Sequence, residues 1–247
     1  MSREASRKTF SVPANDLLRR IPAWECHVHT LFSDGRDGIL DCAARARDLG
    51  LTRIIFTEHT EPWKARTPGW FKEYAAQVHE AARLHAGALE VFLGLEAPAT
   101  DLRDGLDLSA EMRAAADCIL GTAHRYPGLE GRRVRDLSPA ECIELEFETL
   151  KALARNPGID AIAHLGGTCG LYCAAFPEDL AAEVIRMAAQ NGIAIELNSR
   201  YHQPIGRMLD LCVQAGARVT IGSDAHSLDE IGTAFAALLA ALAKEPS

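Results

Sequence analysis

The sequence predicts an α/β protein in which seven βα units surround a parallel sheet. Short apolar runs rich in β-branched residues alternate with longer stretches of helical period, and this alternation is typical of βα units. Polar side chains follow the apolar runs, at the carboxyl ends of the expected strands, where such folds build their active sites. Seven units can close into a barrel or form an open, doubly wound sheet, and the periodicity is the same in both.

The expected strands are the short apolar runs bounded by turn-forming or charged residues. In chain order they are 24–29, 53–57, 90–95, 118–122, 161–164, 193–197 and 219–223. Residues 1–22 come before the first of them and are polar without a clear period. We therefore expect an N-terminal arm over 1–22, followed by a single domain over 23–247.

The expected helices lie between and after the strands. They are placed near 38–49, 70–86, 109–116, 139–154, 178–191, 204–215 and 229–243. Glycine commonly ends a helix because it adopts the left-handed conformation that follows the last turn, and Gly50, Gly192 and Gly216 stand at such positions. Ser138 and Pro139 suit a helix start, since serine caps free N–H groups and proline fits the first turn.

Composition limits the classes of function. The formal net charge of −8 leaves no general basic surface for a phosphate backbone, which argues against nucleic acid as a partner. No apolar run approaches the roughly 18 residues of a membrane span, so no membrane association is expected. The seven cysteines form no zinc-ribbon pattern and indicate reduced thiols, with the cytoplasm as the expected location. The sequence leaves the oligomeric state open.

A set of potential metal ligands gathers at the strand ends. Six of the nine histidines follow expected strands, and in the first strand the period of two places both histidines on one face. A single strand-end histidine is more often structural, but six with two carboxylates indicate a shared site. The strand-end groups are His27, His29, Glu58, His59, Glu96, His124, His164, Glu196, Asn198, Asp224 and His226.

The mixture of imidazole and carboxylate indicates the kind of metal. Such ligands suit zinc, manganese or iron, whereas a shell of oxygens alone would indicate magnesium or calcium. A structural zinc site needs only four ligands, so this larger set favours two or more ions. Two neighbouring ions need a bridging carboxylate and can share a hydroxide acidified for attack. The pattern therefore predicts a metal-dependent hydrolase.

The order of the motifs resembles that of the PHP family (polymerase and histidinol phosphatase) of trinuclear metal phosphoesterases. The resemblance extends from about Ala23 to Leu242 and is closest to the histidinol-phosphatase-like branch. It implies a distorted (β/α)7 barrel with the metal cluster at the C-terminal ends of the strands. The motifs are His27-Val28-His29-Thr30, Ser33-Asp34-Gly35, Phe56-Thr57-Glu58-His59, Gly94-Leu95-Glu96, His124, His164, Glu196-Leu197-Asn198 and Gly222-Ser223-Asp224-Ala225-His226.

The resemblance also implies how two or three divalent ions (zinc, manganese or iron) would be held. Glu96 would bridge the first two ions. The sets are His27, His29, Glu96 and Asp224 for the first ion, Glu96, His124 and His164 for the second, and Asp34, His59 and His226 for the third.

The sequence departs from the family pattern at three positions. Glu25 and Glu58 stand where the family commonly has aspartate, and we expect both to support ligands rather than bind metal. Asp34 stands where many histidinol phosphatases have a histidine, so the substrate need not be histidinol phosphate.

The resemblance predicts hydrolysis of a small-molecule phosphomonoester by a metal-bridging hydroxide, with a histidinol phosphate-like ester as one candidate substrate and with Glu96 and Asp224 in the catalytic set. Arginine commonly clamps phosphate, and Arg125 and Arg200 are the preferred candidates, with Arg66 after them. His202 is a candidate for protonating the leaving group.

Other functions remain open at this point. One is a nuclease or phosphodiesterase acting on nucleotides or oligonucleotide ends, for which Arg132, Arg133 and Arg135 would supply the basic groove. Another is an inactive metal-binding regulatory module, against which the completeness of the ligand set argues. An amidohydrolase is a third, and the lysine-centred signature usual in that superfamily is missing.

Overall fold

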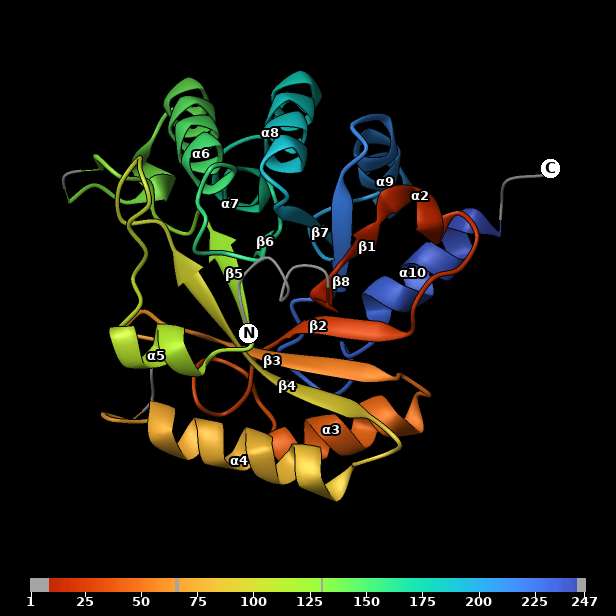
Figure 1. Ribbon diagram of the computed structural model, residues 1–247. Coiled ribbons are helices and arrows are strands. Elements are labelled where there is room, and N and C mark those ends of the chain that lie inside the picture. The colour runs from red at the N-terminus through yellow and green to blue at the C-terminus, as the bar shows by residue number, and fades with distance from the viewer. Residues whose placement is uncertain (1–8, 65–66, 130, 244–247) are drawn as a thin grey trace.

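The computed structural model describes residues 9–64, 67–129 and 131–243, and its sheet curls into the predicted distorted barrel (Figure 1). Seven strands run parallel, and each pairs with the next one in the chain. They are β2 (Trp24–Val28), β3 (Arg53–His59), β4 (Glu90–Pro98), β5 (Cys118–Thr122), β6 (Ala161–Ile162), β7 (Ala194–Asn198) and β8 (Arg218–Gly222).

The last parallel strand returns to the first and closes the barrel at its carboxyl end. Val28 forms a parallel bridge with Ala225, and Ala225 also donates its N–H to the His27 carbonyl at 3.0 Å. In the other direction, the His29 N–H donates to the Ala225 carbonyl at 2.8 Å. The closure therefore brings the first expected motif, near residue 27, beside the last, near residue 224.

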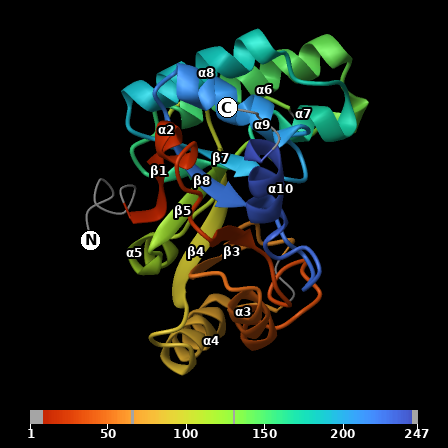
Figure 2. The ribbon, with the colours of Figure 1, turned by 90° about the vertical axis from the view of Figure 1, so that its right-hand side faces the viewer.

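Helices pack on the outside of the curled sheet. The α3 and α4 helices cover one side, and α6, α8 and α9 cover the opposite side (Figures 1 and 2). Their bounds are α3 (Ile39–Asp48), α4 (Phe71–Leu84), α5 (Ala110–Ala115), α6 (Pro139–Leu153), α8 (Glu178–Gln190), α9 (Ile205–Gln214) and α10 (Thr233–Leu242). All seven expected helices and strands are thereby confirmed, although α10 starts at 233 rather than near 229.

Two helix ends show how local sequence sets these boundaries. The Ser138 hydroxyl accepts from the Glu141 N–H, and the Glu141 carboxylate accepts from the Ser138 N–H at 3.0 Å, so α6 starts with a capping box. At the end of α3, Gly50 has a φ of 75°, and the N–H of Leu51 donates to the carbonyl of Ala46. The same closing hydrogen bond ends α8 and α9.

Alternation along the strands divides the core into two layers. Ile54 and Phe56 of β3 pack with the residues beneath the outer helices, whereas Ile55, between them, packs with Phe10, Leu120 and other residues inside the barrel. The inner layer is small and apolar, and it fills the amino-terminal end of the barrel. At the carboxyl end, the same inward-facing positions of β3 and β4 carry His59 and Glu96, because alternate residues of a strand share a face, whereas β2 has an irregularity between Glu25 and Val28 just before its histidines turn inward.

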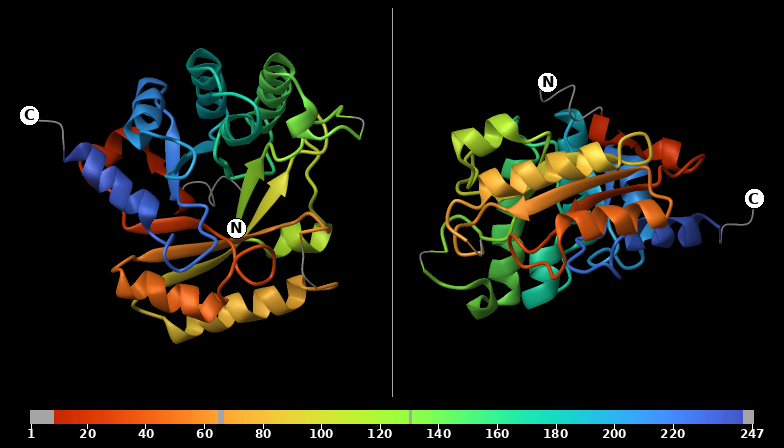
Figure 3. Two further views of the ribbon diagram at one scale, coloured as in Figure 1. Left: turned by 180° about the vertical axis from the view of Figure 1, so that it is seen from behind. Right: turned by 90° about the horizontal axis from the view of Figure 1, so that it is seen from below.

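Elements that the sequence did not predict lie in the N-terminal segment and in the connections that follow β5 and β6. In the expected arm, β1 (Val12–Pro13) pairs antiparallel with β8, and α2 (Ala14–Leu17) buries both of its end residues. The short α7 (Gly167–Tyr172) and a 3-10 turn (Val134–Asp136) follow β6 and β5. The α2 helix packs against α9, and Figure 3 shows both at the edge of the barrel. Within the described residues, no helix has the length and apolar character that crossing a membrane requires.

Candidate metal centre

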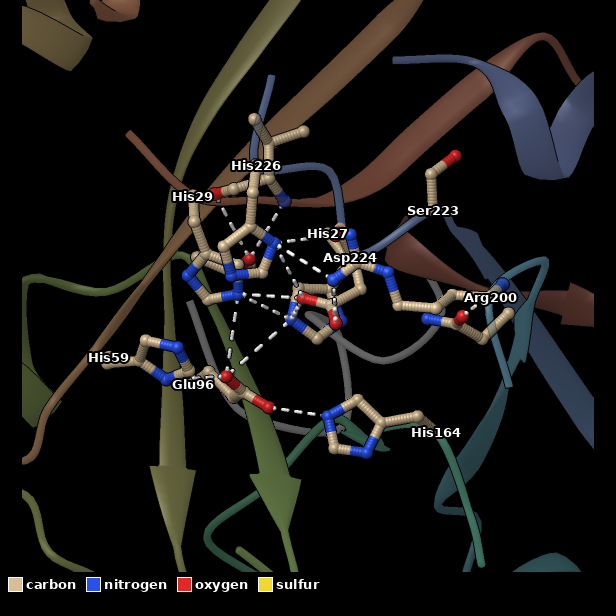
Figure 4. A network of polar contacts seen from close by, with 12 residues as sticks. His27, His29, His59, Glu96, His164, Arg200, Ser223, Asp224 and His226 are labelled. Carbon is tan, nitrogen blue, oxygen red and sulfur yellow. Dashed lines mark hydrogen bonds and ion pairs between the residues drawn. The ribbon is translucent and has the colours of Figure 1, made fainter. Parts of the chain in front are cut away.

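His27, within β2, and His29, just after it, face one another. The Nε2 atoms of His27 and His29 lie 3.0 Å apart, as Figure 4 shows from close by. The other ring nitrogen of His27, Nδ1, lies 2.8 Å from Glu196 Oε1, and Glu196 also accepts the His164 N–H at 2.6 Å. A carboxylate on the far nitrogen of a histidine fixes the ring and directs the free nitrogen toward a ligand.

Glu96 occupies the centre of the cluster and is fully buried. Its Oε1 atom lies 2.8 Å from His164 Nε2 and 3.2 Å from His124 Nε2. Its Oε2 atom lies 2.8 Å from His59 Nδ1 and 3.5 Å from His29 Nε2. The two oxygens thus face different histidines, which is the arrangement expected of a carboxylate between two ions.

Asp224 completes the group around the first pair of histidines. Its Oδ1 atom lies 3.1 Å from His29 Nε2 and 3.5 Å from His27 Nε2. Asp224 has a φ of 52° and His164 a φ of 26°, backbone conformations that cost free energy for residues with a side chain. Just before Asp224, a Cβ on Gly222 would collide with the Glu196 carboxylate, so only glycine lets the strand pass this close.

A third group lies toward the open side of the site. Asp34 Oδ1 is 3.2 Å from the Nε2 atom of His59 and also 3.2 Å from that of His226. Although burial alone would raise the pKa of Asp34, hydrogen bonds with His226 and His59 hold it far below its usual value. Asp34 is therefore ionised at every physiological pH, as a metal ligand must be.

The chemistry of the donor set fits divalent metal ions. Four overlapping sets of histidine and carboxylate side chains bring their ligand atoms within 4.8 Å of one another. Burial and the neighbouring His59 lower the pKa of His29 well below its usual value, so this ring offers a lone pair. Several buried polar atoms make no hydrogen bond among the described residues, and these are His29 Nδ1, Glu61 Oε2, Glu96 Oε2 and His124 Nδ1. Buried polar atoms without a hydrogen bond are costly unless a cation lies among them.

The two glutamates that stand in place of aspartate lie behind the ligands. Glu25 accepts the backbone N–H groups of Ser223 at 2.9 Å and Gly232 at 2.8 Å. Glu58 accepts from both the backbone N–H and the hydroxyl of Thr30, at 2.7 and 2.5 Å. Burial raises the pKa of each to about 7. These hydrogen bonds hold the loops that carry the candidate metal ligands, which is the supporting role expected from the sequence.

The predicted substrate residues have different surroundings. Arg200 lines the cavity above the ligands, with Nη1 3.4 Å from Asp224 Oδ2. Arg125 lines the same cavity, pairs with Asp107 at 2.8 Å and stacks over Trp63 with 4.3 Å to the ring centroid. Arg66 lies outside the described residues.

His202 is not placed for the acid role expected of it. Its Nδ1 atom accepts the Asn198 N–H at 3.1 Å, and its Nε2 atom donates to the Leu165 carbonyl at 3.1 Å. Burial lowers its pKa to about 4, and it does not line the cavity. Both nitrogens of this neutral ring are used by the backbone, which leaves none to protonate a leaving group.

Three further residues reach the cavity and were missed in the sequence. Glu61 is buried with Oε1 3.4 Å from His124 Nδ1, and its position two residues after His59 was the overlooked signal, since alternate residues share a face. Lys64 Nζ lies 2.8 Å from His59 Nε2. Tyr201 packs against His164 with 5.0 Å between ring centroids. The cavity that all three line has a volume of about 270 Å³.

Comparison with known sequences supports a family assignment. Residues 25–200 match the PHP domain. A Clostridium acetobutylicum protein named "Probable histidinol-phosphatase" is 29% identical over 244 residues, covering 86% of this chain and 89% of that protein. An Acetivibrio thermocellus protein named "Probable phosphatase" is 26% identical over 218 residues, covering 84% of this chain and 81% of that protein.

Two solved structures share the fold. A Listeria monocytogenes protein described as a "putative histidinol phosphatase" has a TM-score of 0.69 at 14% identity and covers 86% of this chain and 98% of its own. Histidinol phosphate phosphatase from Lactococcus lactis, complexed with zinc, L-histidinol and phosphate, has a TM-score of 0.61 at 18% identity, covering 88% of this chain and 93% of its own.

Proposed function

Because the chain belongs to the PHP domain family, we propose that it is a metal-dependent phosphoesterase that hydrolyses a small-molecule phosphomonoester. One observation carries this proposal: side chains separated by up to two hundred positions in the chain converge at the floor of one cavity. The converging groups are His27, His29, Asp34, His59, Glu96, His124, His164, Asp224 and His226.

These nine side chains are proposed to hold two or three divalent ions in the sets implied by the family resemblance. The distances to Glu96 support its role as a bridge, because His124 and His164 approach one oxygen while His59 approaches the other. Glu61, next to His124 and His59, is a further possible ligand of the second group. Bound ions would supply Lewis-acid stabilisation of phosphoryl oxygens and a water of lowered pKa.

The remaining cavity residues suit the binding of a phosphoryl group. Arg200 and Lys64 bring positive charge to the open side of the site, where they can offset the charge of phosphoryl oxygens. Burial raises the pKa of Tyr201 well above its usual value, so its phenol remains protonated and can donate a hydrogen bond. Positioning and charge neutralisation are the main requirements of phosphoryl transfer.

The names of the relatives suggest one substrate to include in any test. The Clostridium acetobutylicum protein is named a histidinol-phosphatase, and the Lactococcus lactis structure contains histidinol and phosphate. Histidinol phosphate is therefore a candidate for this chain, alongside other small phosphomonoesters.

The test is an activity screen of zinc- or manganese-loaded protein over phosphomonoesters, histidinol phosphate included. Wild-type protein and the variant His79→Ala, whose histidine is exposed on α4, are expected to be equally active. The variant His124→Ala is expected to lose at least about a hundredfold in kcat, the scale of losing a catalytic metal ligand or its support.

Three results would contradict the proposal. Equal activity in His124→Ala would remove the basis for the second ion. Faster turnover of bis-p-nitrophenyl phosphate than of p-nitrophenyl phosphate would favour the alternative function, a nuclease or phosphodiesterase. Metal-containing protein that hydrolyses no phosphate ester would favour the inactive regulatory module.

A further inference from the structure

A second, larger cavity adjoins the metal centre. It has a volume of about 690 Å³ and lies beneath the segment 126–135, which follows β5. Trp63, His124, Arg125 and Tyr172 line both cavities, so the two open into one another. A group attached to a phosphate in the first cavity can therefore extend into the second.

The second cavity is lined by positive charge. Four arginines face it, and among the described residues that line it there is no aspartate or glutamate. The segment 125–135 contains one acidic residue, Glu130, which lies outside the described residues. The four arginines are Arg125, Arg132, Arg133 and Arg135.

Three of these arginines form ion pairs with carboxylates outside the cavity, and the fourth forms no ion pair among the described residues. Arg125 pairs with Asp107 at 2.8 Å, Arg132 with Glu141 at 3.0 Å, and Arg133 with Asp136 at 3.3 Å. The carboxylates lie outside the cavity lining. In the part of the chain that the structure describes, Arg135 has no carboxylate within ion-pair distance. Exposed ion pairs are worth little, so these guanidinium groups remain available to an anionic ligand.

Two aromatic side chains, Trp63 and Tyr172, are among the residues that line both cavities. The Arg125 guanidinium stacks over the Trp63 ring at 4.3 Å, and the ring of Tyr172 is exposed at the same opening. A guanidinium fixed in this way is preorganised to donate to a planar anion such as a carboxylate or phosphate.

From this arrangement we propose that the second cavity binds the leaving group of the phosphomonoester, and that this leaving group carries a second anionic group, a phosphate or a carboxylate. This inference rests on the proposed phosphatase activity and specifies its substrate class. A leaving group with an ammonium, such as histidinol, would meet four guanidinium groups and no described carboxylate. The cavity therefore selects against it, because the carboxylates that pair with three of the arginines lie outside the lining, and the guanidinium groups are the charges that an ammonium would meet there.

The experiment uses esters with the same reacting bond and different far ends. They are hexyl phosphate, aminohexyl phosphate, carboxypentyl phosphate and hexanediol bisphosphate, assayed with metal-loaded protein. Carboxypentyl phosphate and hexanediol bisphosphate carry an anionic group at the far end. Their kcat/KM is expected to be at least about tenfold higher than that of hexyl phosphate, which is the effect of one charge-assisted hydrogen bond. Comparison of the carboxylate with the second phosphate identifies which anion the cavity prefers. Aminohexyl phosphate is expected to be the poorest substrate.

Variants assign the preference to the cavity. In Arg135→Gln, the ratio of kcat/KM for hexanediol bisphosphate to that for hexyl phosphate is expected to fall by about tenfold. In Arg135→Glu, kcat/KM is expected to rise for aminohexyl phosphate and to fall for the bisphosphate, so that the two values become similar. Arg83→Gln removes an exposed arginine that pairs with Glu80 on α4, and the ratio is expected to stay at its wild-type value.

The outcomes separate the two proposals. Hydrolysis of hexyl phosphate with no preference for an anionic end would overturn the inference and leave the phosphatase activity standing. A preference that survives both Arg135 variants and the paired Arg132→Gln, Arg133→Gln variant would also overturn it. Hydrolysis of none of the four esters would overturn the phosphatase proposal itself.

Discussion

The two adjoining cavities are built in contrasting ways. The metal-ligand cavity is formed by side chains at the ends of parallel strands, and most of them are buried and contact one another. The arginine-lined cavity is formed largely by residues of the segment 126–135, whose arginines are exposed, and two of them, Arg132 and Arg133, pair with surface carboxylates. The difference indicates a division of roles. In our proposal the buried strand-end groups carry out the chemistry, and the loop residues determine which leaving group is accepted.

The largest expected effect comes from the centre of the rigid cavity. Glu96→Gln keeps the shape of the side chain but removes the charge that faces His59, His124 and His164. We expect kcat to fall by at least about a thousandfold and the bound metal to decrease, since removing groups that act only in the transition state costs several kcal/mol.

The matched control for this variant lies on the same strand. Glu90→Gln changes an exposed glutamate at the other end of β4, and both kcat and metal content are expected to remain at wild-type values. Similar losses in the two variants would mean that Glu96 acts through the stability of the strand rather than through metal.

A smaller effect is expected from the open side of the same cavity. Arg200→Gln removes a guanidinium 3.4 Å from Asp224 Oδ2 and 2.8 Å from Glu230 Oε1. We expect kcat/KM to fall by about thirtyfold for every phosphomonoester alike, because Arg200 would contact the phosphoryl group and not the leaving group. Arg207→Gln, on the exposed face of α9, is the control. A loss of kcat/KM confined to esters with an anionic leaving group would mean that Arg200 contacts the leaving group and not the phosphoryl group.

Substitution of His202 tests whether a histidine close to the candidate metal ligands acts as the general acid. His202→Ala leaves the Asn198 N–H and the Leu165 carbonyl without their partner, so we expect the free energy of unfolding to decrease by about 2 kcal/mol. Denaturant titration measures this change, and kcat of the folded fraction is expected to stay within about twofold. A large loss of kcat with unchanged stability would restore the acid role.

Glu146 lies behind the arginine-lined cavity and gives the smallest effect. Burial raises its pKa to about 7, although the Tyr126 hydroxyl, at 2.8 Å, partly opposes this. The folded state therefore retains the proton longer than the unfolded state, and stability decreases as pH rises from about 4.5 to about 7. Glu146→Gln is expected to remove this decrease and to gain about 1 to 2 kcal/mol relative to wild type at pH 8.

The control for Glu146 is on the same helix. Glu144→Gln alters an exposed side chain of α6, and its stability is expected to follow the wild-type dependence on pH. If the difference between Glu146→Gln and wild type were the same at pH 5 and pH 8, the pKa of Glu146 would not be raised by folding.

Much of the fold could be predicted because its signals are local and repeated. All seven parallel strands are short apolar runs, and capping residues such as Ser138 and Gly50 mark helix ends. The short α7 was missed because its sequence, Gly-Thr-Cys-Gly-Leu-Tyr, contains two glycines and no helical period. The pairing of β1 with β8 was missed because two residues contain no periodicity at all.

The site was predictable to the extent that it depends on the strands. Proposed ligands such as Glu96 and His124 follow apolar runs whose direction is set by the sheet, so their approach could be expected before any coordinates. Lys64 and the arginines of 126–135 depend on loop conformations that no period encodes. His202 had the right residue type next to the right motif, but its two backbone hydrogen bonds depend on contacts with a different strand end.

The most direct test of the central claim is the dependence of hydrolysis on metal. Protein stripped with a chelator and dialysed is assayed on p-nitrophenyl phosphate while zinc or manganese is added in known equivalents, with elemental analysis of the reloaded sample. We predict negligible activity without metal and full recovery after two to three equivalents per chain. Full activity in protein shown to contain less than one ion per ten chains would contradict the account.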